Sequence, residues 1–300
     1  MNNFINIFEM SPRDGLQNEK NFIATTDKIK FINKLSLCGF RKIETSSFVS
    51  ARWVPQLADA SEVFMGIKRN ENVKYTALTP NEIGLDNALK VNVDEIAVFA
   101  AASESFSKKN INCDIESSIL RFEPVINKAL KNKIPVRGYI SCVAHCPYEG
   151  NVDPKIVSQI AEKLVNMGCY EVSLGDTTGK GSPDQTLKIL EECLNVLTPD
   201  KLAGHFHDTF KNALKNIEVC IDNGIKTFDS SVGGLGGCPY SPGAEGNVAT
   251  EKVNQLLLLK GYQTNLDMQK INECSKIALK LKKDGTYDSV SYTHLRAHET

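Results

Sequence analysis

Short β-rich runs alternate with longer amphipathic segments along most of this 300-residue chain, and no other sequence feature constrains its fold as strongly. Parallel strands need a crossover segment between them, so the alternation indicates a parallel sheet covered by helices. The pattern predicts about eight strands, the number that a closed (β/α)8 barrel requires. We expect them at Ile5–Glu9, Lys42–Thr45, Val73–Ala77, Glu95–Phe99, Val136–Ser141, Glu171–Leu174, Leu202–Phe206 and Lys226–Asp229.

Two of the intervening segments carry clear helical signals. Thr26–Leu37 repeats apolar residues at helical spacing, and Pro154–Met167 opens with a proline and ends before Gly168. An open doubly wound sheet is the alternative, but it usually has a glycine-rich phosphate turn after its first strand, and Ser11–Gly15 is not such a turn. We therefore predict an α/β fold, a single-domain TIM barrel with its active site at the C-terminal rim.

Composition limits the classes of function. The net charge of -1 gives no overall attraction to nucleic acid or to an anionic membrane. No apolar run is long enough to span a membrane, and the first residues are too polar for a signal peptide, so we expect a soluble, cytoplasmic protein. The 9 cysteines form no Cys-x-x-Cys pair, which indicates neither a disulfide framework nor a structural zinc site.

Residues suited to chemistry fall where the predicted strands end. In chain order they are Arg13, Asp14, Glu44, Asp176, His205, His207 and Cys238. Functional residues of TIM barrels gather at the C-terminal ends of the strands and in the loops that follow. A closed barrel would therefore bring these distant positions to one rim.

His205 and His207 give the sharpest indication of a metal site. Side chains at i and i+2 on a strand project to the same face, so both imidazoles can face one ion. Asp14 and Asn247 can complete the set, and this mixture of nitrogen and oxygen ligands suits Mg²⁺ or Mn²⁺. Zinc would also accept the imidazoles, and ordinary core or surface histidines are the alternative.

Arg13 and Asp14 place a permanent cation beside an acidic group. The guanidinium can stabilise developing enolate charge while the carboxylate binds metal, although an ordinary ion pair at the barrel mouth is the alternative. Glu44 and Asp176 can each hold these groups in place. Asp176 is equally suited to a plain turn or a helix cap.

Cys238 lies in a glycine-rich segment whose backbone could close over a bound ligand. A surface loop with an incidental thiol is the alternative. Lys109 and its neighbour Lys108 follow the fourth predicted strand, where they could hold phosphate groups of a nucleotide-like substrate. Two adjacent lysines are more commonly a solvated helix face.

Six segments together resemble the hydroxymethylglutaryl-CoA lyase family. They are Ser11–Glu19, Ile43–Val49, Lys108–Cys113, Ser173–Thr177, His205–Thr209 and the Cys238 loop, in a colinear match from about Phe4 to Lys283. The wider superfamily of metal-dependent acyl-CoA lyases and Claisen-type synthases shares the Arg-Asp-Gly and His-x-His motifs. It does not share the cysteine loop, which favours the lyase.

The resemblance implies metal-assisted retro-Claisen cleavage of 3-hydroxy-3-methylglutaryl-CoA to acetyl-CoA and acetoacetate. The divalent cation would be held by Asp14, His205, His207 and Asn247. Arg13 would stabilise the enolate, Asp14 or His205 would take the hydroxyl proton, and Cys238 would protonate the carbanion. Lys109 and Asn110 would contact the CoA portion of the substrate.

Two other functions stay open from the sequence. One is a related Claisen-type synthase similar to isopropylmalate or homocitrate synthase, and the other is a non-catalytic barrel that binds an acyl-CoA. We expect a small-molecule substrate and neither nucleic acid nor membrane as partner, and the sequence is compatible with a homodimer. The barrel domain is expected at 1–283, and the tail 284–300, which resembles translated vector sequence, is expected to be non-native or disordered.

Overall fold

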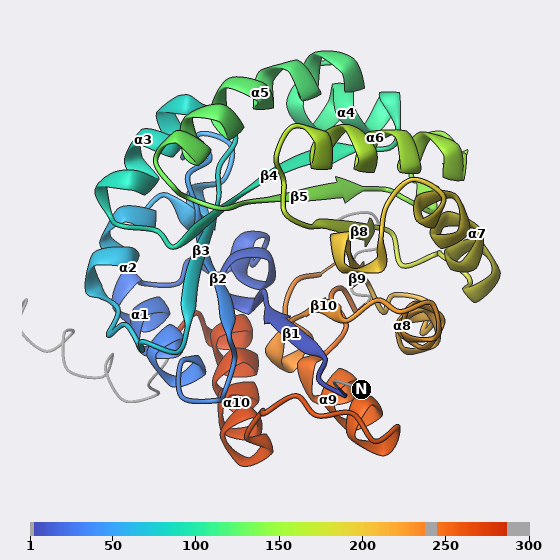
Figure 1. Cartoon of the computed structure of the whole chain (residues 1–300). Helices are drawn as coiled ribbons and strands as arrows, with labels where there is room; N and C mark the ends of the chain where they lie inside the picture. The colour runs from blue at the N-terminus through green and yellow to red at the C-terminus, as the bar shows by residue number, and fades with distance from the viewer. Residues whose placement is uncertain (1–2, 238–244, 287–300) are drawn as a thin grey trace, which may run out of the picture.

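Eight parallel strands close on themselves in a computed structural model that describes residues 3–237 and 245–286 (Figure 1). Their order around the barrel is β1-β10-β9-β8-β5-β4-β3-β2, which confirms the predicted TIM barrel. The strands are β1 (Asn6–Glu9), β2 (Lys42–Ser47), β3 (Lys74–Leu78), β4 (Glu95–Ala101), β5 (Val136–Ser141), β8 (Val172–Asp176), β9 (Leu202–Phe206) and β10 (Thr227–Ser230).

Helices surround the barrel as an outer ring, as Figure 1 shows. Amphipathic patterning explains their placement, since α6 buries Val157, Ile160 and Leu164 on one face. The helices are α1 (Thr25–Leu35), α2 (Ala60–Gly66), α3 (Glu82–Lys90), α4 (Glu104–Ile111), α5 (Ile115–Lys131), α6 (Pro154–Asn166), α7 (Pro183–Leu194), α8 (Ala213–Asp222), α9 (Thr250–Leu259) and α10 (Met268–Asp284). Short helical turns lie at η1 (Ser11–Gly15), η2 (Pro55–Leu57), η3 (Pro199–Lys201) and η4 (Val232–Gly234).

The strand boundaries differ from the predicted ones by no more than two residues. The largest extensions are at the C-terminal ends, where β2 continues to Ser47, β4 to Ala101 and β8 to Asp176. The sequence at the polar end of β2 does not look strand-like. Ser47 nevertheless pairs with Leu78 of β3, which keeps this end of β2 in the sheet. The sequence did not predict the small antiparallel hairpin of β6 (His145–Cys146) and β7 (Gly150–Asn151), whose two-residue strands carry too little pattern.

The strands alternate between two environments. In β5, Val136 and Ile140 belong to the apolar layer between the strands and the helices. Arg137 and Tyr139 are also buried, and Tyr139 packs with Phe8 in a separate cluster. Because successive side chains of a strand point to opposite faces, these polar residues line the barrel interior. The interior therefore supplies buried polar groups beneath the rim.

The last described helix, α10, extends to Asp284, one residue past the predicted domain boundary. Gly285 follows it with φ 69°, a left-handed conformation that favours glycine and ends helices. Residues 287–300 lie outside the described residues, so the boundary at 283 and the nature of the tail stay predictions. Among the described residues, the structure contains no helix with the length and apolar character to cross a membrane.

Candidate active site

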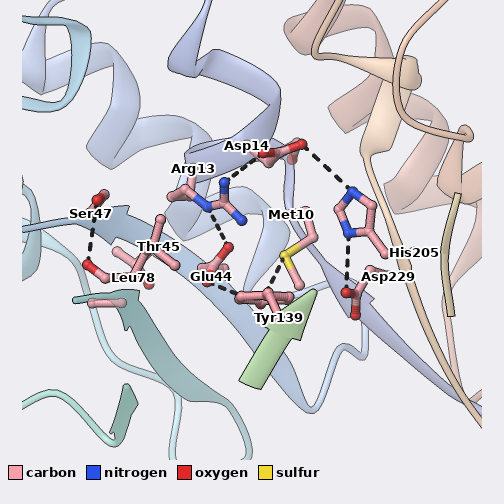
Figure 2. Close-up of polar contacts among 12 residues, drawn as sticks. Met10, Arg13, Asp14, Glu44, Thr45, Ser47, Leu78, Tyr139, His205 and Asp229 are labelled. Carbon is pink, nitrogen blue, oxygen red and sulfur yellow. Dashed lines mark hydrogen bonds and ion pairs between the residues drawn. The ribbon is translucent and has the colours of Figure 1, made fainter. Parts of the chain in front are cut away.

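The turn after β1 delivers two charged side chains to the rim. η1 is a π-helical turn, closed by a hydrogen bond of 3.1 Å from the Gly15 amide to the Met10 carbonyl. Within it, Arg13 Nη1 donates to Asp14 Oδ1 at 2.5 Å. Figure 2 shows Arg13 reaching toward Glu44 while Asp14 faces His205. The turn thus places neighbouring residues of opposite charge in one site.

Glu44 holds the guanidinium of Arg13 in place. Arg13 Nε donates to Glu44 Oε2 at 2.5 Å, and Tyr139 donates its hydroxyl to Glu44 Oε1 at 3.1 Å. Burial raises the pKa of Glu44, although Arg13 opposes that shift. Burial disfavours the charge of Arg13, but Glu44 and Asp14 outweigh it, so the pKa of Arg13 is higher than usual. The guanidinium is therefore fixed and permanently charged.

Asp14, His205 and His207 form a potential metal-binding cluster. One ligand atom from each lies within 4.8 Å of the other two. His205 Nε2 is 3.9 Å from Asp14 Oδ2, and the two imidazole centroids are 5.7 Å apart. The structure brings together the two histidines that the strand spacing singled out and Asp14, which was expected to complete the set.

Charge and burial in this cluster suit a divalent cation. Burial and the nearby His205 lower the pKa of His207 to about 4, so its imidazole is neutral at pH 7. The pKa of Asp14 lies well below its usual range, because Arg13 and His205 outweigh the effect of burial. Within the described part of the chain, the buried Nδ1 of His207 has no hydrogen-bond partner. Neutral imidazole, as at His207, and ionised carboxylate, as at Asp14, are the states that metal binding requires.

Asn247 also lies at the cluster. It pairs with His207 in an isolated antiparallel bridge, and its Nδ2 donates to Asp14 Oδ2 at 2.6 Å. An amide nitrogen is a donor and not a metal ligand, so Asn247 could bind a cation only after its amide turned its oxygen inward. Asn247 therefore lies beside the other proposed metal ligands, but its amide nitrogen faces Asp14.

Asp176 ends β8 and closes a turn. Its Oδ2 accepts a hydrogen bond of 2.9 Å from the Gly181 amide, as the turn interpretation predicted. Burial raises the pKa of Asp176 to about 6, against the opposing effect of the backbone amides and of His205. Its other carboxylate oxygen is buried without a hydrogen-bond partner among the described residues. Asp176 therefore has both a structural contact and an unused oxygen.

The remaining predicted residues lie apart from this cluster. Lys109 and Asn110 are exposed on α4, and Lys109 Nζ lies 3.6 Å from the centroid of the Tyr148 ring. None of the contacts described for these two residues reaches the Asp14 cluster. Cys238 lies outside the described residues, so its predicted role stays a prediction.

Sequence reasoning missed several buried polar residues beneath the rim. Arg137 and Tyr139 of β5 and Asp229 of β10 connect Glu44 to His205. Asp229 Oδ2 lies 3.1 Å from His205 Nδ1. The available signal was the spacing of Arg137 and Tyr139, since charged and polar residues at i and i+2 of an otherwise apolar strand indicate a polar barrel interior.

Comparison with known proteins identifies the family. The sequence profile described as HMGL-like matches residues 4–278. The chain belongs to the HMGL-like family. This HMGL-like chain is 49% identical over 294 residues to the cytoplasmic 3-hydroxy-3-methylglutaryl-CoA lyase of Rattus norvegicus, covering 98% of this chain and 86% of the relative.

Two solved structures extend the match to three dimensions. The HMG-CoA lyase of Brucella melitensis aligns with a TM-score of 0.93 and 50% identity, covering 94% of the HMGL-like chain and 99% of its own. An HMG-CoA lyase from Acinetobacter baumannii, solved in complex with coenzyme A and 3-methylmalate, aligns with a TM-score of 0.89 and 32% identity. That match covers 99% of this chain and 97% of the other.

Proposed function

We propose that this protein cleaves 3-hydroxy-3-methylglutaryl-CoA to acetyl-CoA and acetoacetate. The observation that carries the proposal is the cluster of half-buried Asp14 with buried His205 and His207, beside the fixed guanidinium of Arg13. The lyases of rat and Brucella melitensis, each about half identical to this chain over nearly its whole length, support it. The complex of the Acinetobacter baumannii lyase with coenzyme A supports an acyl-CoA substrate.

The same cluster is proposed to hold Mg²⁺ or Mn²⁺. Asp14, His205 and His207 would be its ligands, joined by Asn247 once the amide oxygen faces the site. When bound there, such a cation would acidify the tertiary hydroxyl of the substrate. The orphaned Nδ1 of His207 and the lowered pKa of Asp14 support this assignment.

Cleavage also needs a proton acceptor and a group that stabilises the thioester enolate. Asp14 or His205 would accept the hydroxyl proton. Arg13 uses Nε for Glu44 and Nη1 for Asp14, and a guanidinium has five N–H donors, so others can donate to the thioester oxygen. Because Glu44 and Asp14 fix the guanidinium in advance, little reorganisation is needed as charge develops.

The other residues have narrower proposed roles. Cys238 would protonate the carbanion of acetyl-CoA, a role that rests on its sequence context alone. Asp176 would hold the rim between β8 and α7, and Lys109 with Asn110 would contact the CoA portion. We also propose a cytoplasmic location, which the name of the rat relative supports, and a homodimer as the assembly to test by light scattering.

Purified protein incubated with 3-hydroxy-3-methylglutaryl-CoA, with and without Mg²⁺, tests the proposal. We expect metal-dependent formation of acetyl-CoA and acetoacetate in equal amounts. Condensation of acetyl-CoA with a 2-oxo acid would instead indicate a synthase, and acyl-CoA binding without turnover would indicate a binding protein. Either outcome would reject the lyase.

A thiol-blocking reagent gives a second test, because the lyase mechanism requires Cys238. The other eight cysteines are all buried, which limits their reaction with the reagent. We expect the reagent to inhibit the wild-type protein and to leave the residual activity of Cys238→Ser unchanged. Equal inhibition of both proteins would remove Cys238 from the mechanism.

A further inference from the structure

Asp229 is a buried carboxylate directly behind the proposed metal ligands. Its side chain, on β10, has 0% exposed surface. Its Oδ2 lies 3.1 Å from His205 Nδ1 and accepts hydrogen bonds from the Ser173 hydroxyl at 2.7 Å and Arg137 Nη1 at 3.0 Å. Figure 2 shows the contact between Asp229 and the inner edge of the His205 ring. None of the proposed catalytic steps uses this carboxylate.

The contact belongs to a closed ring of polar side chains inside the barrel. Starting at the guanidinium of the site and returning to it, the ring passes through Arg13, Glu44, Tyr139, Arg137, Asp229, His205 and Asp14. Its members come from five strands or the turns that follow them. Within this ring, the contact of 3.1 Å between Nδ1 and Asp229 orients the imidazole of His205, whereas its Nε2 lies 3.9 Å from Asp14.

Hydrogen bonding to a carboxylate determines where a neutral imidazole carries its proton. A carboxylate accepts hydrogen bonds, so the nitrogen that faces Asp229 must be the protonated one. His205 would then keep its lone pair on Nε2, the atom 3.9 Å from Asp14. The alternative tautomer would place a proton at Nε2 and remove that nitrogen from metal binding.

We propose that Asp229 is a positioning residue that holds His205 with Nδ1 protonated and Nε2 directed at the metal. The inference rests on the proposed function for the identity of the ligands. Arg137 keeps Asp229 in place, because its Nη2 lies 2.9 Å from the second carboxylate oxygen. Loss of a carboxylate that orients a metal-binding histidine typically weakens metal binding by about 10–100-fold.

Glu171 provides a matched control. It pairs with Arg137 Nε at 2.8 Å, yet none of its described contacts involves His205. Asp229→Asn and Glu171→Gln each neutralise one carboxylate partner of Arg137, so both disturb the same buried guanidinium. They differ in that only Asp229→Asn removes the charge beside His205.

Binding of Mn²⁺ to the full-length proteins, followed by the electron paramagnetic resonance of the free ion, tests the proposal. We expect Asp229→Asn to raise the Kd for Mn²⁺ by about 10–100-fold and Glu171→Gln to leave it close to wild type. Equal Kd values for Asp229→Asn and wild type would overturn the proposal. Equal weakening in both variants would also overturn it, because that result would indicate general damage around Arg137.

A measurement on the wild-type protein covers the case in which Asp229→Asn does not fold. Long-range ¹H–¹⁵N spectra of the Mg²⁺-loaded protein distinguish the two imidazole tautomers, and the chain has only five histidines to assign. We expect His205 to be protonated at Nδ1. A proton at Nε2 would reject the proposal independently of any variant.

Neither readout depends on turnover of an acyl-CoA. A wild-type protein that binds Mn²⁺ but does not cleave 3-hydroxy-3-methylglutaryl-CoA would reject the proposed function and leave the role of Asp229 intact. Cleavage by wild type together with an unchanged Kd in Asp229→Asn would support the proposed function and reject the role of Asp229. A wild-type protein that binds no divalent cation would overturn both.

Discussion

Both ends of the barrel interior carry polar side chains, but these bond to one another at one end, whereas at the other some keep an atom without a partner in the described part of the chain. At the N-terminal end, Lys42, Glu95 and Tyr170 form a closed triangle. Lys42 Nζ binds Glu95 Oε2 and the Tyr170 hydroxyl, and that hydroxyl binds Glu95 Oε1, each at 2.6 Å. At the C-terminal rim, by contrast, His207 and Asp176 each retain a buried polar atom without a hydrogen-bond partner among the described residues.

The difference separates polar groups that hold the fold together from those that await a ligand. A buried polar atom without a partner costs about 1–3 kcal/mol, so a folded protein seldom keeps several in one place. The closed triangle avoids this cost by satisfying its own members. The rim does not, and a bound cation or substrate would offset the cost there. Substitutions at the two ends should therefore separate activity from stability.

Asp14→Asn should give the largest effect, because it impairs the proposed active site at the C-terminal rim and leaves the N-terminal end of the barrel unchanged. We expect turnover to fall by about 10³-fold or more, because the change removes the charge from the proposed metal cluster. The change also removes the ion pair of Asp14 with the buried Arg13, but the Asp14 side chain is 21% exposed, so we expect only a modest fall in the thermal midpoint. Turnover of acyl-CoA and calorimetry on one preparation check both parts. Near-wild-type turnover would exclude Asp14 from the site.

Arg13→Lys should be nearly as damaging as Arg13→Ala. A lysine retains the charge but cannot bind Glu44 and Asp14 while also donating to an oxyanion, so we expect kcat to fall by about 10²–10³-fold. Steady-state kinetics of the two variants check this. Recovery of most of the rate in Arg13→Lys would show that the position needs only a charge.

Glu9→Gln should change how the stability of the protein depends on pH. Glu9 is a buried carboxyl at the end of β1, and burial raises its pKa from 4.5 to about 7. Its described partners are neutral donors: the Ser11 and Val232 amides and the Thr250 hydroxyl. The folded state therefore binds a proton more tightly than the unfolded state. Titration of Glu9 should by itself remove up to about 3 kcal/mol of wild-type stability as pH rises from 4.5 to 7.

Glu9→Gln has no such proton to lose. Its free energy of unfolding should vary less across this pH range than that of wild type, and urea unfolding at a series of pH values checks the difference. Identical pH profiles for the two proteins would show that Glu9 does not titrate with folding.

Lys42→Met should give the smallest effect, because it removes only the contacts of Lys42 within the closed triangle at the N-terminal end. Removing one partner of a buried ion pair costs several kcal/mol, but the Lys42 side chain is 30% exposed, so we expect a loss of about 1–2 kcal/mol. Turnover should remain at the wild-type level. A large loss of kcat with unchanged stability would mean that the two ends are not separate in function.

The sequence predicted the barrel well because alternation repeats along the whole chain. Local errors occurred where that signal is weak, as at the polar end of β2 and at the β6–β7 hairpin. Arg13, Asp14, His205 and His207 could be singled out because they lie at strand ends, where TIM barrels carry function. The closed barrel then explains why Asp14 and His205 meet although they are 191 positions apart.

Asp229 and Arg137 could not be assigned in the same way. Their importance depends on which strand lies next to which, and on the rotamers that join them across the interior. A single aspartate in β10 gives no indication of its distance to His205 of β9 until the register is known. The orientation of the Asn247 amide is likewise a property of its neighbours, since the residue type allows either end to face Asp14.

The wide turn of η1 also has a consequence for how the site can vary. Successive residues of a regular helix are rotated by about 100°, so adjacent side chains point in different directions. In the π-helical turn η1 the adjacent Arg13 and Asp14 nevertheless contact each other, with Arg13 Nη1 2.5 Å from Asp14 Oδ1. Deleting one residue from Ser11–Gly15 would remove the hydrogen bond from the Gly15 amide to the Met10 carbonyl that closes this turn, and would shift Arg13 or Asp14 away from its partners in the site. The spacing of this segment is therefore as much a part of the site as its chemistry.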